Sequence, residues 1–140
     1  MTTYNSNLAS EFYVLSMLYR LGIDASLTLG NKKAVDIIIA KDDGTLITID
    51  VKGVAGKYDW PADNIHDFVK ANQFYIFLSF EGRISDPQKI PAVWVMPAKE
   101  ISRFIKKYSN RVDISRSKVN LNGQSFLNAW SLLINNNESK

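Results

Sequence analysis

Two aspartates and a lysine stand in neighbouring apolar segments at a spacing that could hold a cation. Asp36 interrupts a run of Ala, Val and Ile, and Asp50 and Lys52 close the next apolar run. The Asp-Asp-Gly sequence at 42–44 separates the runs and is typical of a tight hairpin turn. If it forms that turn, Asp36 lies opposite Asp50 with Cβ atoms roughly 4.5–5.5 Å apart. Two carboxylates this close repel each other unless a cation or a shared proton lies between them.

Strand periodicity predicts on which side these groups lie. Side chains alternate across a strand, so Asp50 and Lys52 share one face, and Ile47, Ile49 and Val51 share the other. Both aspartates interrupt runs typical of buried strands, where a carboxylate is costly unless it is paired or binds a metal. An Asp-x-Lys triplet also occurs by chance at strand ends, and Lys52 would then form only a salt bridge with one of the aspartates.

The composition narrows the chemistry to oxygen ligands. The 140 residues include no cysteine and one histidine, His66. Disulfides, thiolate zinc sites, cysteine nucleophiles and multi-histidine metal sites are therefore excluded, and a Ser-His-Asp hydrolase is disfavoured. Carboxylates suit a hard cation, so we expect Mg²⁺, or Mn²⁺ in its place, as the cofactor.

The length and composition are typical of one globular domain. Hydrophobic residues make up 46% of the chain and charged residues 22%, as in ordinary globular proteins. We expect a single domain over residues 1–134 and a disordered tail over 135–140. The first ten residues lack a signal-peptide pattern, and no apolar run is long enough for a bilayer. These features predict a cytoplasmic protein without membrane contact.

The basic residues are concentrated in one segment. The net charge is +3, with 17 basic and 14 acidic residues. Residues 98–118 hold seven of the basic and two of the acidic residues, an excess of five, which leaves 10 basic against 12 acidic elsewhere. Such an excess favours a polyanionic partner, although alone it is weak support.

A first helix is expected over 8–21, with Asn7 as its N-cap and Gly22 at its end. Its apolar residues recur at helical spacing and should face the core: Leu8, Phe12, Leu15, Leu18 and Tyr19. At about 100° per residue, Glu11 falls inside that stripe. Glu11 is then either a flank residue that reaches solvent or an arginine, or a third carboxylate directed at the hairpin.

Further elements follow along the chain. Expected are strands over 24–29, 74–80 and 93–96, helices over 63–71, 97–108 and 125–133, and turns or loops over 30–33, 53–61 and 81–91. A strand–helix–strand unit from the hairpin to 74–80 implies a parallel crossover. The helix over 97–108 would turn Lys106 and Lys107 to solvent, away from the hairpin, so we expect them to contribute little to catalysis.

The loop over 53–61 directly follows Lys52 and contains two glycines. We expect it to move and to contact substrate, because Lys57, Tyr58 and Trp60 offer charge and stacking surfaces to a nucleic-acid strand. The alternative is that Trp60 simply packs against the next helix.

This order of elements, with Glu11 on the first helix, Asp36 on the second strand and Asp50-Val51-Lys52 on the third, resembles the PD-(D/E)XK nuclease superfamily. The resemblance spans residues 8–80. It implies a three-layer α/β/α, restriction-endonuclease-like fold with a mixed central sheet of about five strands and core order αβββαβ. The chain departs from the pattern in lacking a proline before Asp36 and in having aspartate at position 50, where glutamate is commoner.

The resemblance also assigns roles. Asp36 and Asp50 would be metal ligands, Lys52 the catalytic lysine, and Glu11 the helix acid seen in Holliday-junction-resolvase-like members. Two functions stay open: a metal-dependent nuclease, with DNA as the expected substrate, or a non-catalytic module with this fold that binds nucleic acid or protein. A homodimer is compatible with either.

Overall fold

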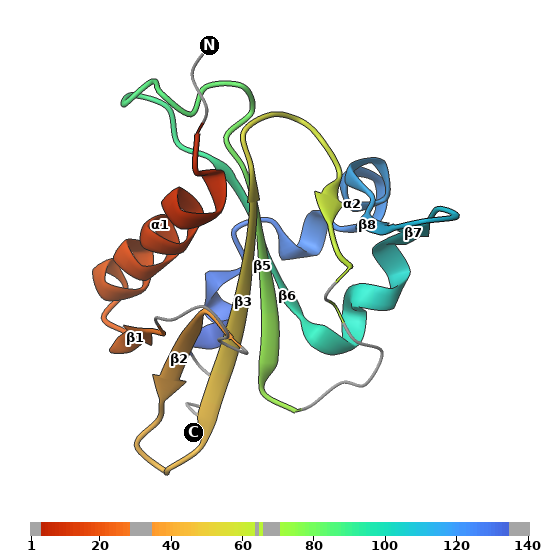
Figure 1. Ribbon diagram of the computed structural model, residues 1–140. Helices are drawn as coiled ribbons and strands as arrows, with labels where there is room; N and C mark the ends of the chain where they lie inside the picture. Colours follow the sequence, from red (N-terminus) through yellow and green to blue (C-terminus); the bar gives the residue numbers. More distant parts are fainter. Residues whose placement is uncertain (1–3, 29–34, 64, 66–70, 135–140) are drawn as a thin grey trace.

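The computed structural model describes residues 4–28, 35–63, 65 and 71–134 (Figure 1). The elements are α1 (Ser6–Arg20), β1 (Ala25–Leu27), β2 (Ile37–Ala40), β3 (Leu46–Val54), β4 (Trp60–Pro61), β5 (Gln73–Ser79), β6 (Ala92–Pro97), η1 (Ala98–Phe104), β7 (Ile105–Lys107), β8 (Val112–Ile114), α2 (Arg116–Asn122), η2 (Gln124–Phe126) and η3 (Trp130–Leu133), where η marks a 3₁₀ helix. Within the described residues, no helix has the length and apolarity needed to cross a bilayer.

A five-stranded sheet in the order β1-β2-β3-β5-β6 forms the centre of the molecule. β3 and β5 run parallel, and the other neighbouring strands run antiparallel. The predicted mixed α/β fold with about five strands is therefore confirmed. A second, three-stranded sheet in the order β4-β8-β7 lies on one side of the first. The expected turn over 30–33 and most of the expected helix over 63–71, including His66, lie outside the described residues.

The β2–β3 hairpin has the predicted register. Ile37 pairs with Ile49, and Ala40 pairs with Leu46. The Gly44 amide donates to the Lys41 carbonyl at 2.9 Å, and the φ of Gly44 is +90°. That left-handed conformation is one that glycine adopts without strain, which explains why Gly ends the Asp-Asp-Gly turn.

The two sides of the five-stranded sheet are covered by different side chains. The α1 side, here called the aliphatic side, buries Val14, Leu18, Ala25, Ile37, Ile39, Ile47, Ile49, Val51, Ile76, Leu78, Val93, Val95 and Leu133. The other side, here called the aromatic side, buries Trp60, Ala62, Tyr75, Phe77, Trp94, Met96, Ala98, Ile101, Phe104, Ile114 and Val119. The aromatic side is covered by the β4-β8-β7 sheet, η1 and α2 (Figure 1).

α1 packs on the sheet through a face that overlaps the predicted stripe only in part, since Leu18 is buried as expected. Its buried residues are Ser10, Glu11, Val14 and Leu18. The helix comes close because β3 has Gly53 at the contact, where an added Cβ would lie 1.8 Å from Ser10 Oγ. The small-residue face therefore docks on β3, and three residues of the predicted stripe stay exposed instead: Leu8, Phe12 and Tyr19. The N-cap is also different, since Asn5 Oδ1 accepts from the Leu8 amide at 3.0 Å.

The segment after β6 departs most from the prediction. The expected helix over 97–108 is wrong, because η1 ends at Phe104 and the chain turns extended at Ile105 (φ −75°, ψ 138°). Ile105 pairs with Ile114, so the basic residues that follow lie on the β7–β8 hairpin. The expected helix over 125–133 is likewise two 3₁₀ turns, interrupted near Asn128 with a φ of +54°.

Candidate active site

Asp36 lies where β2 begins, beside β3. Its amide donates to the Ile49 carbonyl at 3.0 Å, and its Oδ2 accepts from the Val51 amide at 2.7 Å. One step beyond the Ile37–Ile49 pair, the register places Asp36 opposite Asp50. The structure therefore positions the two predicted metal ligands on neighbouring strands, with the Asp36 carboxylate fixed against the backbone of β3.

Asp50 and Lys52 are half-buried and alternate with buried Ile49 and Val51. The predicted division of faces along β3 is thus confirmed. In the parallel register, Asp50 lies beside Tyr75 and Lys52 beside Phe77, which places both on the aromatic side.

The phenol of Tyr75 is affected by this position. Burial raises the pKa of Tyr75 to about 12, and the neighbouring Asp50 carboxylate contributes to the rise. A phenol with that pKa stays protonated at any physiological pH. Tyr75 can therefore donate a hydrogen bond beside Asp50, but it does not act as a base.

Glu11 approaches from the other side of the sheet. It is 7% exposed and shares the buried face of α1 with Ser10 and Val14. Among the described residues, no three carboxylate or imidazole side chains gather into a group that could hold a metal ion. The structure thus brings Asp36 next to the Asp50 strand but does not add Glu11 to form a three-carboxylate cluster.

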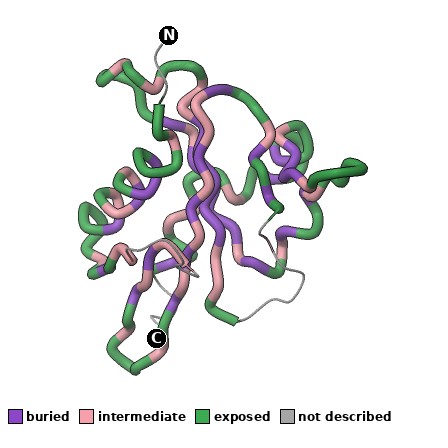
Figure 2. Tube along the Cα trace, in the orientation of Figure 1, coloured by how far each residue is buried: buried purple, intermediate pink, exposed green. Residues whose placement is uncertain are grey.

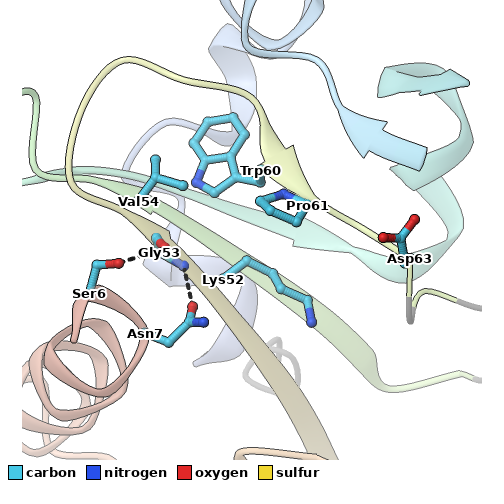
Figure 3. A pocket seen from close by; sticks show the side chains of 8 residues that line it. All are labelled: Ser6, Asn7, Lys52, Gly53, Val54, Trp60, Pro61 and Asp63. Atoms are coloured by element: carbon cyan, nitrogen blue, oxygen red, sulfur yellow. Dashed lines mark hydrogen bonds between the residues drawn. The ribbon is translucent and has the colours of Figure 1, made fainter. Parts of the chain in front are cut away.

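A pocket of about 440 Å³ opens beside the end of β3 (Figure 3). It is lined by Ser6, Asn7, Lys52, Gly53, Val54, Trp60, Pro61 and Asp63. Lys52 extends along this pocket beneath Pro61 (Figure 3). Such a volume falls within the range of small-ligand sites.

The first turn of α1 forms one wall of the pocket and is tied to Gly53. The Gly53 amide donates to Asn7 Oδ1 at 3.1 Å, and the Ser6 hydroxyl donates to the Gly53 carbonyl at 3.4 Å. Asn7 is therefore not the N-cap predicted from the sequence. Instead, its side chain fixes the helix to the strand that carries Lys52.

No protein-family model matches the chain, and no curated protein matches it by sequence. A bacterial homing endonuclease, I-Ssp6803I, aligns over 94% of this chain and 91% of its own, with a TM-score of 0.54 and 11% sequence identity. The fold is nuclease-like.

In this nuclease-like fold, Trp60 is a core residue. It is fully buried, its indole N–H donates to the Leu78 carbonyl at 2.8 Å, and its ring lies 5.3 Å from that of Phe77. The prediction that Trp60 stacks on nucleic acid is therefore wrong for this structure, because a ring packed between strands has no face to offer. Lys57 and Tyr58 are exposed, and their contact with substrate stays a prediction.

The loop over 53–61 is held by long-range hydrogen bonds. The Ser79 hydroxyl donates to the Gly56 carbonyl at 2.8 Å, and the Arg116 amide donates to Asp59 Oδ1 at 2.8 Å. The Gly82 amide donates to the Ala55 carbonyl at 2.8 Å. These hydrogen bonds hold the loop in place, so they favour a fixed loop over the mobile one that we expected.

Arg116 is one of the residues that join this loop to the rest of the aromatic side. Its guanidinium donates to both carboxylate oxygens of Glu81 at 2.9 Å and lies 4.8 Å from the Trp94 ring centre. Hydrogen bonds from Arg116 lower the pKa of Glu81, against the effect of burial. Nothing in the local sequence points to this pair, since 35 positions separate its members.

The β7–β8 hairpin is joined to the pocket through β4. Pro61 pairs with Asp113, the Ala62 amide donates to the Val112 carbonyl at 2.9 Å, and Asp63 Oδ1 accepts from the Val112 amide at 2.8 Å. The basic side chains on and beside this hairpin are exposed: Lys106, Lys107 and Arg111. They therefore lie on the same side of the sheet as Lys52. The expected helix over 97–108 had instead turned Lys106 and Lys107 away from the Lys52 hairpin.

Proposed function

We propose that the protein is a divalent-metal-dependent nuclease that hydrolyses phosphodiester bonds in DNA. The observation that carries the proposal is the placement of Asp36 beside Asp50, with Lys52 on the same face of β3 and extended along a pocket. The structurally similar protein I-Ssp6803I is an endonuclease, and the likeness of fold supports the same class of activity.

The donor set fits a hard divalent cation. Asp36 and Asp50 would hold Mg²⁺ or Mn²⁺, because Mg²⁺ commonly binds one or two carboxylates and keeps several waters. This coordination does not require Glu11 as a direct ligand. When bound, such an ion neutralises phosphate charge and lowers the pKa of its water.

Each nearby side chain then has a role of its own. The Lys52 ammonium stabilises negative charge that develops on the phosphate, or orients the attacking water. The protonated Tyr75 hydroxyl can donate a hydrogen bond next to Asp50. Asn7 and Ser6 hold the first turn of α1 against Gly53 and so keep that wall of the pocket in place.

Substrate would contact two exposed surfaces around the pocket. Lys57 and Tyr58 lie on the loop that follows β3, and Tyr58 is 65% exposed. Lys106, Lys107 and Arg111 lie on the hairpin joined to β4. Their charges suit the phosphate backbone, whose recognition is independent of sequence.

The test combines binding and cleavage. Purified protein is incubated with linear duplex, nicked, branched and single-stranded DNA in Mg²⁺ or Mn²⁺, and Mn²⁺ binding is measured by calorimetry without DNA. We expect cleavage of at least one substrate, together with Mn²⁺ binding that Asp50→Ala abolishes. Asp43→Ala is the matched control, because Asp43 is exposed at the turn of the same hairpin and should change neither result.

Two results would contradict the proposal. Absence of cleavage on all substrates with both metals would favour the non-catalytic alternative, provided the protein still bound DNA. Mn²⁺ binding that is equal in wild type and Asp50→Ala would place the metal elsewhere.

A further inference from the structure

The β7–β8 hairpin carries a run of six exposed residues that projects from the body of the molecule. Residues 106–111, with the sequence Lys-Lys-Tyr-Ser-Asn-Arg, are all exposed. Figure 2 shows the turn between the two strands standing clear of the rest of the chain. The run contains three basic residues and no acidic one. A projecting element with this charge is suited to a polyanionic partner.

Backbone pairing makes the hairpin a two-stranded ribbon up to its tip. Ile105 pairs with Ile114 at the root, and Ile114 is fully buried in the aromatic side. The Tyr108 amide donates to the Arg111 carbonyl at 2.8 Å, next to the turn. At about 3.3 Å per residue, the ribbon rises about 13 Å from its root to Ser109. The hairpin is therefore anchored in the core at one end and paired along its whole length.

These dimensions match the major groove of duplex DNA. That groove is about 12 Å wide and about 8.5 Å deep, and it admits a two-stranded ribbon, whose strands lie about 4.8 Å apart. A ribbon of this height reaches the base edges at the floor of the groove while its root stays outside the phosphates. The major groove of an RNA duplex is too deep and narrow for side chains to read. The hairpin therefore fits a DNA duplex better than an RNA duplex.

Arg111 is held in one orientation near the tip of this ribbon. Its Nε–H donates to Asp113 Oδ2 at 3.3 Å, and its guanidinium carbon lies 4.2 Å from the centre of the Tyr108 ring. Asp113 is buried on the central strand of the small sheet, so the acid is itself fixed. The bond through Nε leaves the two terminal guanidinium nitrogens to donate elsewhere, on a side chain that is 53% exposed.

The two terminal nitrogens match one base edge. Guanine presents O6 and N7 as acceptors in the major groove, and a bidentate arginine is the commonest specific contact to them. Because Asp113 and Tyr108 already orient the guanidinium, it loses little freedom on binding. Lys106 and Lys107, nearer the root, suit the flanking phosphates, which carry no sequence information. The hairpin thus combines groups for phosphate contact with one group for base contact.

The root of the hairpin adjoins the proposed active site. Val112, the residue after Arg111, donates its amide to Asp63 Oδ1 at 2.8 Å. Asp63 lines the pocket that also contains Lys52, and Figure 3 shows both side chains on its rim. The hairpin therefore begins one hydrogen bond away from the pocket wall, and a duplex bound across the pocket extends past it.

We propose that the β7–β8 hairpin enters the major groove of duplex DNA and that Arg111 reads a guanine there. Binding then depends on DNA sequence, beyond the phosphate contacts. The inference rests on the proposed function only in taking DNA as the substrate, since it requires neither metal nor cleavage. The alternative is that Arg111 serves only to neutralise the buried Asp113 carboxylate.

The first experiment selects DNA sequences by binding, without divalent metal so that no cleavage occurs. A duplex library with a randomised central segment is bound to the wild-type protein, and the retained duplexes are sequenced. We expect an enriched motif that contains a fixed guanine. Arg111→Lys should lose the preference at that position, which is about 5- to 150-fold for a bidentate pair. Its affinity for unselected duplex should be unchanged, because lysine keeps the charge beside Asp113 but not the planar fork.

Arg103→Lys is the matched control. Arg103 also pairs with an acid, Glu100, at 2.7 Å, and its guanidinium lies 5.1 Å from the centre of the Phe104 ring. It lies on η1 rather than on the hairpin. The same substitution there should leave the enriched motif intact. Circular dichroism checks that both variants are folded.

The second experiment uses the wild type alone, so it does not depend on the folding of a variant. Dimethyl sulfate methylates guanine at N7, in the major groove, and adenine at N3, in the minor groove. In the selected duplex, methylation of the fixed guanine should block binding. Methylation of adenines in the motif should leave binding intact.

Three outcomes would overturn the inference. They are the lack of any enriched motif, a motif that folded Arg111→Lys retains in full, and interference from adenine N3 in place of guanine N7. None of these outcomes depends on cleavage. A protein that selects a motif but cuts no substrate would contradict only the proposed nuclease activity, and one that cuts DNA without sequence preference would contradict only the role of Arg111.

Discussion

The two sides of the five-stranded sheet are made by the same strands but are covered in different ways. β5 illustrates the contrast, because Ile76 and Leu78 face the aliphatic side and Tyr75 and Phe77 the aromatic side. On the aliphatic side, a single helix lies close against β3. On the aromatic side, rings separate the main sheet from a second small sheet, and the Trp60 indole joins the two layers by its hydrogen bond to the Leu78 carbonyl.

This difference explains where a site can form. Close helix packing on the aliphatic side leaves Glu11 buried, with Ser10 against the strand. The aromatic side has a covering layer made of loops and short strands, and the pocket beside Lys52 opens at its boundary. The aliphatic side therefore supports the strands, and the aromatic side supplies the groups that can do chemistry.

The largest expected effect is on the aromatic core. Trp60→Ala should lower the free energy of unfolding by about 3–5 kcal/mol, because it leaves a large cavity and removes the hydrogen bond to Leu78. Urea titration, monitored by circular dichroism, measures this free energy of unfolding. Trp130→Ala is the control, since Trp130 is half-buried and should cost less. Equal losses of unfolding free energy in the two variants would show that Trp60 stabilises the fold no more than a half-buried tryptophan does.

The next effect concerns the proposed chemistry at Lys52. Lys52→Ala should lower kcat by about 10²–10³, the usual cost of removing a group that stabilises transition-state charge. Mn²⁺ binding, measured by calorimetry, should persist because an ammonium group is not a metal ligand. Lys89→Ala, on an exposed loop, should retain full activity. A kcat within a few-fold of wild type for Lys52→Ala would reduce Lys52 to a structural residue.

The Glu81–Arg116 pair gives a smaller, pH-dependent effect. Glu81→Gln should lower the free energy of unfolding by about 1.5–3 kcal/mol near neutral pH, as for hydrogen bonds to charged groups. Because the folded-state pKa of Glu81 is lowered, this stability is present above the ordinary value of 4.5 and is lost as the pH falls through the folded-state pKa. The difference between wild type and variant should therefore shrink in acid. A difference that is constant from pH 7 to pH 3 would contradict the charge-based account.

The smallest effect is expected at the hairpin beyond the pocket. Lys106→Ala with Lys107→Ala should weaken DNA binding about ten-fold and lower the salt dependence by about two phosphate contacts, with kcat unchanged. The sequence predicts that these lysines contribute little to catalysis and at most a sequence-independent share of DNA affinity, but it places them on a helix that the structure replaces with β7 and β8. Lys99→Ala, exposed on η1, is the control. Unchanged DNA affinity and salt slope in the double variant would show that the hairpin does not contact the substrate.

Local pattern was sufficient to predict the central hairpin. The Asp-Asp-Gly turn fixes which residues pair, and alternation along β3 then separates Asp50 and Lys52 from Ile49 and Val51. Both signals act within a few residues, so no knowledge of the rest of the chain is needed. The functional roles of these residues are still predictions.

The wrong predictions have long-range causes. α1 has apolar residues on two faces, and the choice between them depends on Gly53, far along the chain. Ile105 follows a helical spacing of apolar residues, yet pairing with Ile114 makes it a strand residue. Trp60 is buried because its indole N–H donates to the Leu78 carbonyl and its ring packs on Phe77. Each outcome depends on a partner that a local window does not contain.

Gly53 also limits how this protein can change in evolution. Every replacement of glycine adds at least a Cβ, and here that atom would lie 2.6 Å from Ser10 Cβ and 2.9 Å from the Ser6 carbonyl oxygen. Shortening Ser10 would relieve the first contact but not the second, because the second is with backbone. A tolerated substitution at position 53 therefore requires α1 to shift as a whole, which would move Ser6 and Asn7 away from the pocket. Position 53 is thus closed to gradual substitution, although its residue carries no chemistry of its own.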